Sequence, residues 1–237
     1  MSIYYENLTP AQFRERISTA PVAYLPLGTI EWHGEHLPLG TDLIISRGFF
    51  ASLAEEVGGI VLPGYFIGPD RLSTINGLDY IGMDTAPADP LQLDGSAYWI
   101  PDDLYENMLF ATLKQLKRAG FKVVVAHGHG PSTGLFAKNT EKWEKELSLK
   151  LFHCWHEGGG HGIQTDHAGI NETSLVLHYH PQTVDMSALD KDEFSATMFG
   201  GAAFSEATAA LGEATAKTQH ARMAALIRTA LEENACT

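Results

Sequence analysis

The feature that most constrains this chain is an apolar run, Val22–Leu27, that leads directly into a dense cluster of acidic and imidazole side chains. The run is bounded by Pro21 and Gly28 and is typical of a buried strand. Residues 31–42, which follow it, contain three carboxylates and two imidazoles. Charged groups at the rim of a buried sheet are costly unless they pair with one another or bind a cation. The sequence therefore predicts a metal site on the loop after this strand.

Three residues of this cluster are the first candidate ligands. Glu31 and His33 are two apart, so in an extended stretch they face the same side. Gly34 and Gly40 allow the loop to fold Asp42 back towards them. The alternative is an ion-paired surface loop, but residues 31–42 contain no Lys or Arg that could pair with the carboxylates.

Strand-like and helix-like segments alternate along the rest of the chain. Further strands are expected at 60–63, 121–126 and 151–155, and helices at 43–57, 101–118 and 133–149, with one or two more in 201–234. This alternation predicts an α/β fold with a mostly parallel sheet and helices on both faces. Residues 64–101 are rich in Gly, Pro and Asp, and we expect a long loop that covers a site or makes subunit contacts.

Bulk properties exclude several classes of protein. A length of 237 residues allows one large or two small domains, and a net charge of −13 argues against nucleic-acid binding. No apolar stretch approaches the ~18 residues of a membrane span. The N-terminus has no secretory signal, so we expect no membrane association. Two cysteines are too few for a disulfide framework, which makes the cytoplasm the expected compartment.

Two later clusters also carry chemistry. His127 and His129 follow the 121–126 strand and occupy the same place in the fold as the first cluster. One of them as a metal ligand is expected, and a turn with a capping histidine is the alternative. In the third cluster, Asp166 can orient His167 for proton transfer, and Glu172 can reach the same pocket. A helix cap explains this third cluster equally well.

These motifs together resemble those of a known family. Residues 26–42 closely resemble the signature of the creatininase (creatinine amidohydrolase) family. Gly128-His129-Gly130 resembles its Asn-Gly-His-Gly-Gly-Asn turn, and His167-Ala168-Gly169 followed by Glu172-Thr173-Ser174 resembles its late His-Ala-Gly…Glu-Thr-Ser motif. The resemblance implies one three-layer α/β/α domain over residues 1–237 with a mainly parallel sheet. It also implies assembly as a homo-oligomer, commonly a hexamer, and two divalent metal ions, zinc or manganese.

The resemblance also implies roles for individual residues. Glu31 would bind one metal together with His129, His33 would bind the other, and Asp42 would bridge both. His36 would not bind a metal itself but would orient one of the metal-binding side chains. His167 would be the acid–base residue, with Asp166 beside it.

Two departures from the family pattern concern the ligands. Creatininase places a metal-binding Glu two residues after the histidine of the middle turn, and here that position is Pro131. We expect Glu172 to be the substitute ligand. His127 also stands where the family turn has Asn.

The resemblance implies a binuclear metallohydrolase in which metal-activated hydroxide attacks a carbonyl of a small, polar, cyclic molecule. Cleavage of a C–N bond in a cyclic amide or a formamide is the first reaction class. Ring-opening C–C hydrolysis of a cyclic keto-polyol, such as a keto-inositol, is the alternative. A mononuclear enzyme and a non-catalytic metal- or ligand-binding protein on the same scaffold are the remaining hypotheses. The side chains expected to contact substrate are those of Arg71, His127, Trp155 and Gln164.

Overall fold

The structure is a computed structural model that describes residues 1–86, 89–154, 163–191 and 203–235. Its centre is a four-stranded parallel sheet in the order β2-β1-β5-β6. The strands are β1 (Val22–Leu27), β2 (Ile60–Val61), β5 (Val123–Gly128) and β6 (Lys150–His153). Pairing of β1 with β5 runs from Val22 opposite Val123 to Leu27 opposite Gly128. The ends of these two strands therefore lie side by side.

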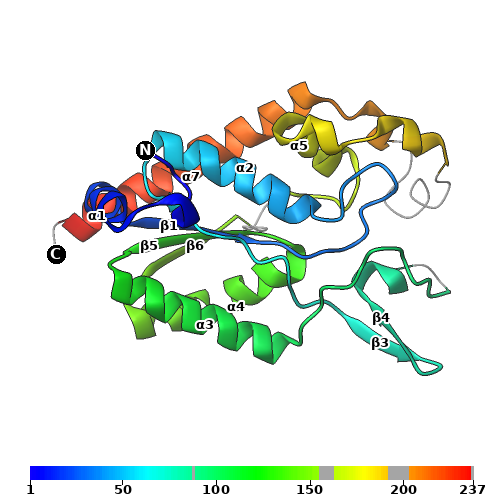
Figure 1. Ribbon diagram of the computed structural model, residues 1–237, viewed down its shortest axis with the longest axis horizontal. Coiled ribbons are helices and arrows are strands. Elements are labelled where there is room, and N and C mark those ends of the chain that lie inside the picture. Colours follow the sequence, from blue (N-terminus) through cyan, green and yellow to red (C-terminus); the bar gives the residue numbers. More distant parts are fainter. Residues whose placement is uncertain (87–88, 155–162, 192–202, 236–237) are drawn as a thin grey trace.

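Helices cover both faces of the sheet, as Figure 1 shows. One face carries α2 (Thr41–Glu56), α5 (Ile170–Tyr179) and α7 (Ala209–Ala235), and the other carries α3 (Asp102–Ala119) and α4 (Gly130–Leu147). The predicted α/β/α arrangement with a mainly parallel sheet is confirmed. The remaining helical segments are α1 (Pro10–Thr19), η1 (Tyr5–Asn7), η2 (Gly82–Thr85), η3 (Pro181–Thr183), η4 (Met186–Lys191) and η5 (Ala203–Glu206). Among the described residues, no helix is both long and apolar enough to cross a membrane.

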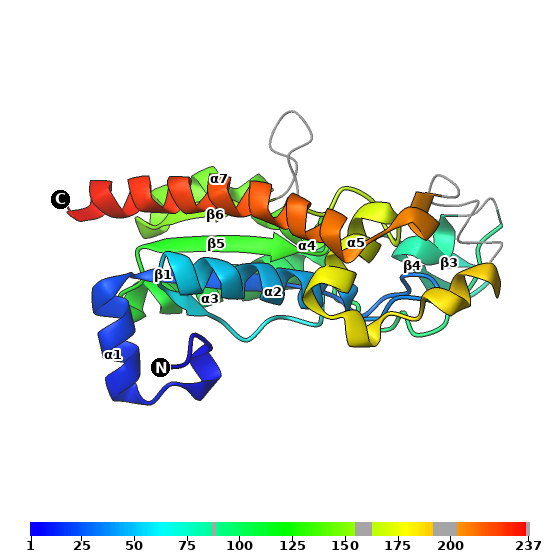
Figure 2. The ribbon, with the colours of Figure 1, turned by 90° about the horizontal axis from the view of Figure 1, so that it is seen from above.

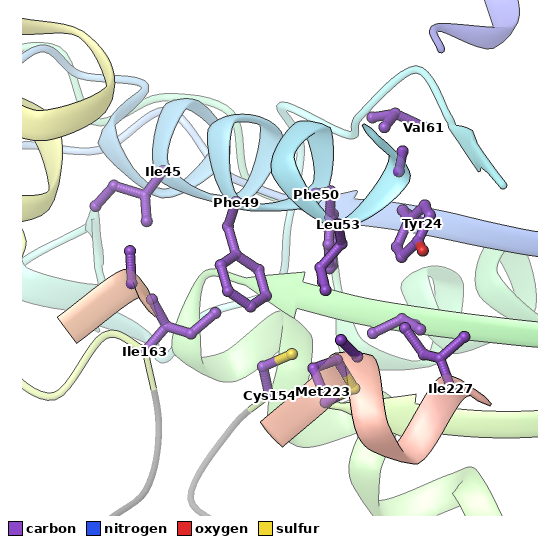
Figure 3. Packing of buried hydrophobic residues seen from close by; sticks show 14 of the residues in the cluster. Tyr24, Ile45, Phe49, Phe50, Leu53, Val61, Cys154, Ile163, Met223 and Ile227 are labelled. Atoms are coloured by element: carbon purple, nitrogen blue, oxygen red, sulfur yellow. The ribbon is translucent and has the colours of Figure 1, made fainter. Parts of the chain in front are cut away.

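Successive side chains of β1 point to opposite faces of the sheet, which divides the core into two layers. Val22 and Tyr24 pack under α2, α5 and α7, whereas Ala23 and Leu25 pack towards α3 and α4. Figure 3 shows the first layer, in which Phe49 of α2 points towards Cys154 and towards residues of α7. Burying a side chain of this size stabilises the fold by roughly 1.5–3 kcal/mol. Both faces of the sheet are therefore fixed by apolar packing, which holds the strand ends in place.

The segment 64–101 differs from the loop that we predicted. It contains an antiparallel hairpin, β3 (Leu72–Ile75) and β4 (Leu78–Ile81), that lies apart from the main sheet in Figure 1. The turn between the strands is Asn76-Gly77, and both residues have positive φ. This dipeptide favours the tight turns of hairpins. The prediction of a continuous loop is therefore wrong for this part of the segment. The Asn-Gly turn forms a hairpin even though its two strands have only a weak apolar pattern.

Figure 2 shows that β5 points towards the end of the molecule where α5 and the hairpin lie. In parallel α/β sheets, ligands bind beyond the carboxyl ends of the strands. The candidate site is therefore expected at this end.

Candidate metal centre and active site

Four segments bring carboxylates and imidazoles together at the carboxyl end of the sheet. The loop after β1 supplies Glu31 and His33, and Asp42 lies in the first turn of α2. His129 follows β5 directly, and Glu172 lies in the first turn of α5. The partial positive charge at a helix N-terminus favours a carboxylate there, which suits both helical residues. All five side chains are buried, with exposed fractions of 0–6 %.

Backbone contacts fix the two segments that follow the strands. The amide of Glu31 donates to the carbonyl of Leu39 at 3.1 Å, which closes the loop that carries His33. The amide of His129 donates to the carbonyl of Leu27 at 2.6 Å across the β1–β5 pair. Gly128 between β5 and this residue has a φ of +151°, a conformation that favours glycine.

The five side chains form two groups that share one carboxylate. Nδ1 of His129 lies 3.0 Å from Glu31 Oε1 and 3.4 Å from Asp42 Oδ2. Nε2 of His33 lies 3.7 Å from the same Asp42 oxygen and 3.8 Å from Glu172 Oε2. Each group of three can hold one metal ion, with Asp42 common to both.

The distances around His33 fit a shared cation better than hydrogen bonds. Nδ1 of His33 lies 3.1 Å from the carbonyl of Glu31, and because a carbonyl only accepts, Nδ1 carries the proton. In the neutral ring, Nε2 therefore presents a lone pair to the carboxylates, at distances beyond the usual 2.7–3.2 Å of N–H···O bonds. Two donor atoms about 2.1 Å from one tetrahedral ion lie ~3.4 Å apart. Neither His33 Nε2 nor Asp42 Oδ2, both buried, has a hydrogen-bond partner in the described part of the chain.

The pKa values of these side chains reflect the short distances between charged groups in the cluster. Burial lowers the pKa of His33, but the carboxylates of Asp42, Glu172 and Glu31 outweigh burial and raise it overall. For Asp42, burial favours the neutral acid, yet the neighbouring imidazoles of His33 and His129 hold the pKa well below its usual range. Burial raises the pKa of Glu172 to about 8. The site thus holds like charges close together, a cost that divalent cations offset.

Gln164 holds two of these carboxylates in place. Its Nε2 donates to Asp42 Oδ1 at 2.7 Å and to Glu172 Oε1 at 3.0 Å. The other oxygen of Glu172 accepts the amide proton of Ala168 at 2.6 Å. These bonds leave Asp42 Oδ2 and Glu172 Oε2 directed towards His33.

His167 lies against the cluster, and its ring stacks on His33 with centroids 4.2 Å apart. Nε2 of His167 lies 2.9 Å from the carbonyl of Trp32 and therefore carries the proton. Nδ1 faces Glu31 Oε1 at 3.9 Å. Burial, followed by the nearby His33, lowers the pKa of His167, which favours the neutral imidazole.

Asp166 contacts the start of α5. Its Oδ2 accepts the amide proton of Asn171 at 2.7 Å, and its Oδ1 accepts that of Glu172 at 3.0 Å. Asp166 therefore caps the first turn of α5, the alternative that the sequence left open, and satisfies amides that have no partner within the helix. The carbonyl of Trp32 contacts Nε2 of His167.

The other predicted residues are placed as follows. His127 lines the cavity, packs against Phe49 and Phe50, and has Nδ1 2.8 Å from Ser46 Oγ. Burial lowers the pKa of His127 to about 4, so it is neutral. His36 lies behind the cluster, with Nε2 2.9 Å from Thr173 Oγ1. Trp155 falls outside the described residues.

A cavity of about 420 Å³ opens beside the cluster. Its described lining includes Glu31, Asp42, His129, Glu172, His167, Gln164, Asp166, His127 and Arg71, and also Asp70, a polar residue that would suit a hydroxyl-rich ligand but whose contact with His129 was not predicted from the sequence. Asp70 Oδ2 lies 3.3 Å from His129 Nε2, the ring nitrogen opposite the one that faces Glu31. No local signal in the sequence marks this contact, because Asp70 precedes a hairpin with no periodic link to β5.

Comparison with known proteins identifies relatives of this chain. The family model described as creatininase, creatinine amidohydrolase, matches residues 6–235. A creatinine amidohydrolase from Pseudomonas putida is 25% identical over 209 residues, which cover 78% of this chain and 75% of that protein. A 3-dehydro-scyllo-inosose hydrolase from Thermotoga maritima is 24% identical over 195 residues, 76% of this chain and 57% of the relative. Among solved structures, a manganese creatininase superposes with a TM-score of 0.73 at 18% identity, covering 97% and 98% of the two chains.

Proposed function

Since this chain belongs to the creatininase family and is a hydrolase of that family, we propose that it acts with two divalent cations on a small, polar, cyclic substrate. The proposed reaction is hydrolysis of a C–N bond in a cyclic amide or a formamide. The observation that carries the proposal is the carboxylate of Asp42, which belongs to two buried groups of three candidate ligands.

Each cation would have its own set of ligands. Glu31, Asp42 and His129 would hold one, and His33, Asp42 and Glu172 would hold the other. Zinc and manganese both suit this mixture of carboxylate and imidazole donors. Bound there, the cations supply Lewis acidity, which lowers the pKa of a water to about 7 and polarises a carbonyl oxygen.

Glu172 is proposed as the ligand that replaces the missing one at position 131. Pro131 is exposed and has no donor atom in its side chain, so it cannot bind a metal. Glu172 Oε2 lies 3.8 Å from His33 Nε2, inside the second group. The substitution of one carboxylate by another from α5 keeps the charge of the donor set unchanged.

His167 is proposed to move the proton. Its Nε2 is held by the carbonyl of Trp32, so Nδ1, on the side of Glu31, is the atom that takes up a proton and returns it to the leaving group. Such a step typically contributes ~10²–10⁴-fold to the rate. The half-buried ring lines the cavity, so Nδ1 can reach a bound substrate.

A second reaction class is favoured by the cavity lining. Asp70, Arg71 and Gln164 offer hydrogen-bonding groups that suit the hydroxyls of a cyclic keto-polyol. One relative is named for hydrolysis of a keto-inositol. Ring-opening C–C hydrolysis is therefore the alternative reaction at the same centre.

The test combines metal analysis with a turnover screen. Metal-loaded protein should contain two ions per chain by plasma mass spectrometry and turn over at least one class among lactams, formamides and cyclic keto-polyols. His167→Ala should lose ~10²-fold or more of the rate and keep both ions, while Glu172→Gln should lose metal. His180→Ala, at an exposed histidine, is the control that should change neither. One ion per chain, or full activity in His167→Ala, would contradict the proposal.

A further inference from the structure

Arg71 stands at the mouth of the cavity in a fixed position. Its amide donates to Asp70 Oδ1 at 2.6 Å, and its carbonyl accepts the amide proton of Gly82 at 2.8 Å. Its Nη2 donates to the Thr85 hydroxyl and, at 3.5 Å, to the carbonyl of Gly82. The guanidinium is thus anchored through one nitrogen. Binding a ligand therefore costs little further conformational entropy of this side chain.

Within the described part of the chain, no carboxylate oxygen lies within ion-pair distance of the Arg71 guanidinium, although the same cavity is lined by several acids. The nearest in sequence, Asp70, faces His129 instead. The hydrogens on Nε and Nη1 are therefore available. They lie on different edges of the guanidinium, so each can donate singly to an oxygen of a carboxylate or phosphate.

Arg71 also lies where two hollows meet. It lines the cavity beside the metal centre and a second hollow of about 310 Å³ on its outer side. The outer hollow is also lined by Lys138, which is exposed and likewise has no acidic partner among the described residues, and by two carboxylates, Asp70 and Asp102. Arg71 and Lys138 therefore share one hollow, and of these two only Arg71 also lines the cavity beside the candidate metal ligands.

We infer that the substrate carries an anionic group, a carboxylate or a phosphate, which Arg71 binds while the reacting carbonyl lies at the metal centre. This inference rests on the proposed function and specifies its substrate class. Hydrogen bonds to a charged group are each worth enough to change affinity by roughly 10–100-fold.

The first test measures ligand binding and does not depend on catalytic turnover. Acetate and succinate both offer one carboxylate to the metal centre, but only succinate has a second one for Arg71. Titration calorimetry of the metal-loaded protein should show succinate binding at least about 10-fold more tightly than acetate. Arg71→Met should abolish this preference with metal content unchanged. Lys138→Met removes the same charge from the outer hollow and should keep most of the preference. Replacing succinate by 3-phosphonopropionate then separates a phosphate site from a carboxylate site.

The second test uses matched substrates. N-formylglycine and its neutral amide differ only in the anionic group, as do hydantoin-5-acetate and its amide. The anionic member should have the higher kcat/KM by about 10-fold or more, and Arg71→Met should equalise the pair. Equal affinity for acetate and succinate, or equal losses in the Arg71 and Lys138 variants, would overturn the inference. If the protein binds two metals and hydrolyses neutral substrates equally well, only this inference fails, whereas absent metal binding refutes the proposed function.

Discussion

Asp70→Asn tests whether a carboxylate outside the ligand set tunes the proposed metal centre. Asp70 Oδ2 lies 3.3 Å from His129 Nε2, while Nδ1 of the same ring faces Glu31 and Asp42. A carboxylate behind a ligating imidazole fixes the tautomer of the ring and strengthens it as a donor. The amide of Asn keeps the shape and removes the charge.

The magnitude can be bracketed from this distance. Full charges 3.3 Å apart at an effective dielectric constant of 20 interact by roughly 5 kcal/mol, which is an upper limit. The side chain of Asp70 is 18% exposed and the ring carries only part of a charge, so the effect is smaller. Loss of such a partner typically weakens metal affinity by 10–100-fold, which corresponds to about 1.4–2.7 kcal/mol.

Competition with a fluorescent chelator measures this loss directly. Asp79→Asn removes the same charge from the exposed hairpin, where Asp79 accepts from the Thr74 hydroxyl, and should leave the affinity unchanged. Gly82→Ala supplies an independent perturbation, because Gly82 has a φ of +52° and a methyl group there would overlap Asp70 Oδ2. It should weaken metal binding without altering any charge. An Asp70→Asn affinity within twofold of the wild type would refute the reasoning.

Three further predictions concern stability. Removing metal with a chelator should lower the free energy of unfolding by about 2.7 kcal/mol per site relative to protein at 100 times Kd, read as a drop of at least ~5 °C in Tm; no change in Tm would argue against a site formed only on folding. Gly128→Ala should cost at least ~3 kcal/mol in denaturant unfolding, because its methyl group would overlap the carbonyl oxygen of Leu27. Burial raises the pKa of Cys154 from 9.0 to about 12, so the unfolded state loses its proton first and stability falls as the pH rises from 9 towards 12. Between pH 8 and pH 10 the wild type should lose about 1.4 kcal/mol more than Cys154→Ala, measured by urea titration in a Cys236→Ser background.

The main outline of the fold could be predicted because its signals are local. The β-branched run before His127 is a strand in any context that buries it, and Gly120 ends α3 in the left-handed conformation that it favours. The convergence of the β1 and β5 clusters follows from topology as well. Parallel neighbours end at the same edge, and Leu27 is paired with Gly128. Glu31 and His129 therefore meet.

The contacts of residues 64–101 could not be predicted in the same way. Asp70 reaches His129 across a separation of 59 residues, and nothing in the spacing of its neighbours encodes that approach. The contacts of Asp166 could not be fixed from the sequence either. A carboxylate next to a histidine in sequence can face that histidine or the start of the following helix, and Asp166 accepts from two amides at the start of α5.

The residues that could be predicted and those that could not also differ in how the fold holds them. The candidate metal ligands lie at the ends of paired strands and in the first turns of packed helices, where the core fixes them. Asp70 and Arg71 come from a segment that lies outside the main sheet, so they can change without disturbing that core. Relatives that share this family carry names for substrates as different as creatinine and a keto-inositol. A segment outside the sheet can vary without changing side chains that the core holds in place, which is a physical route by which one scaffold can serve different substrates.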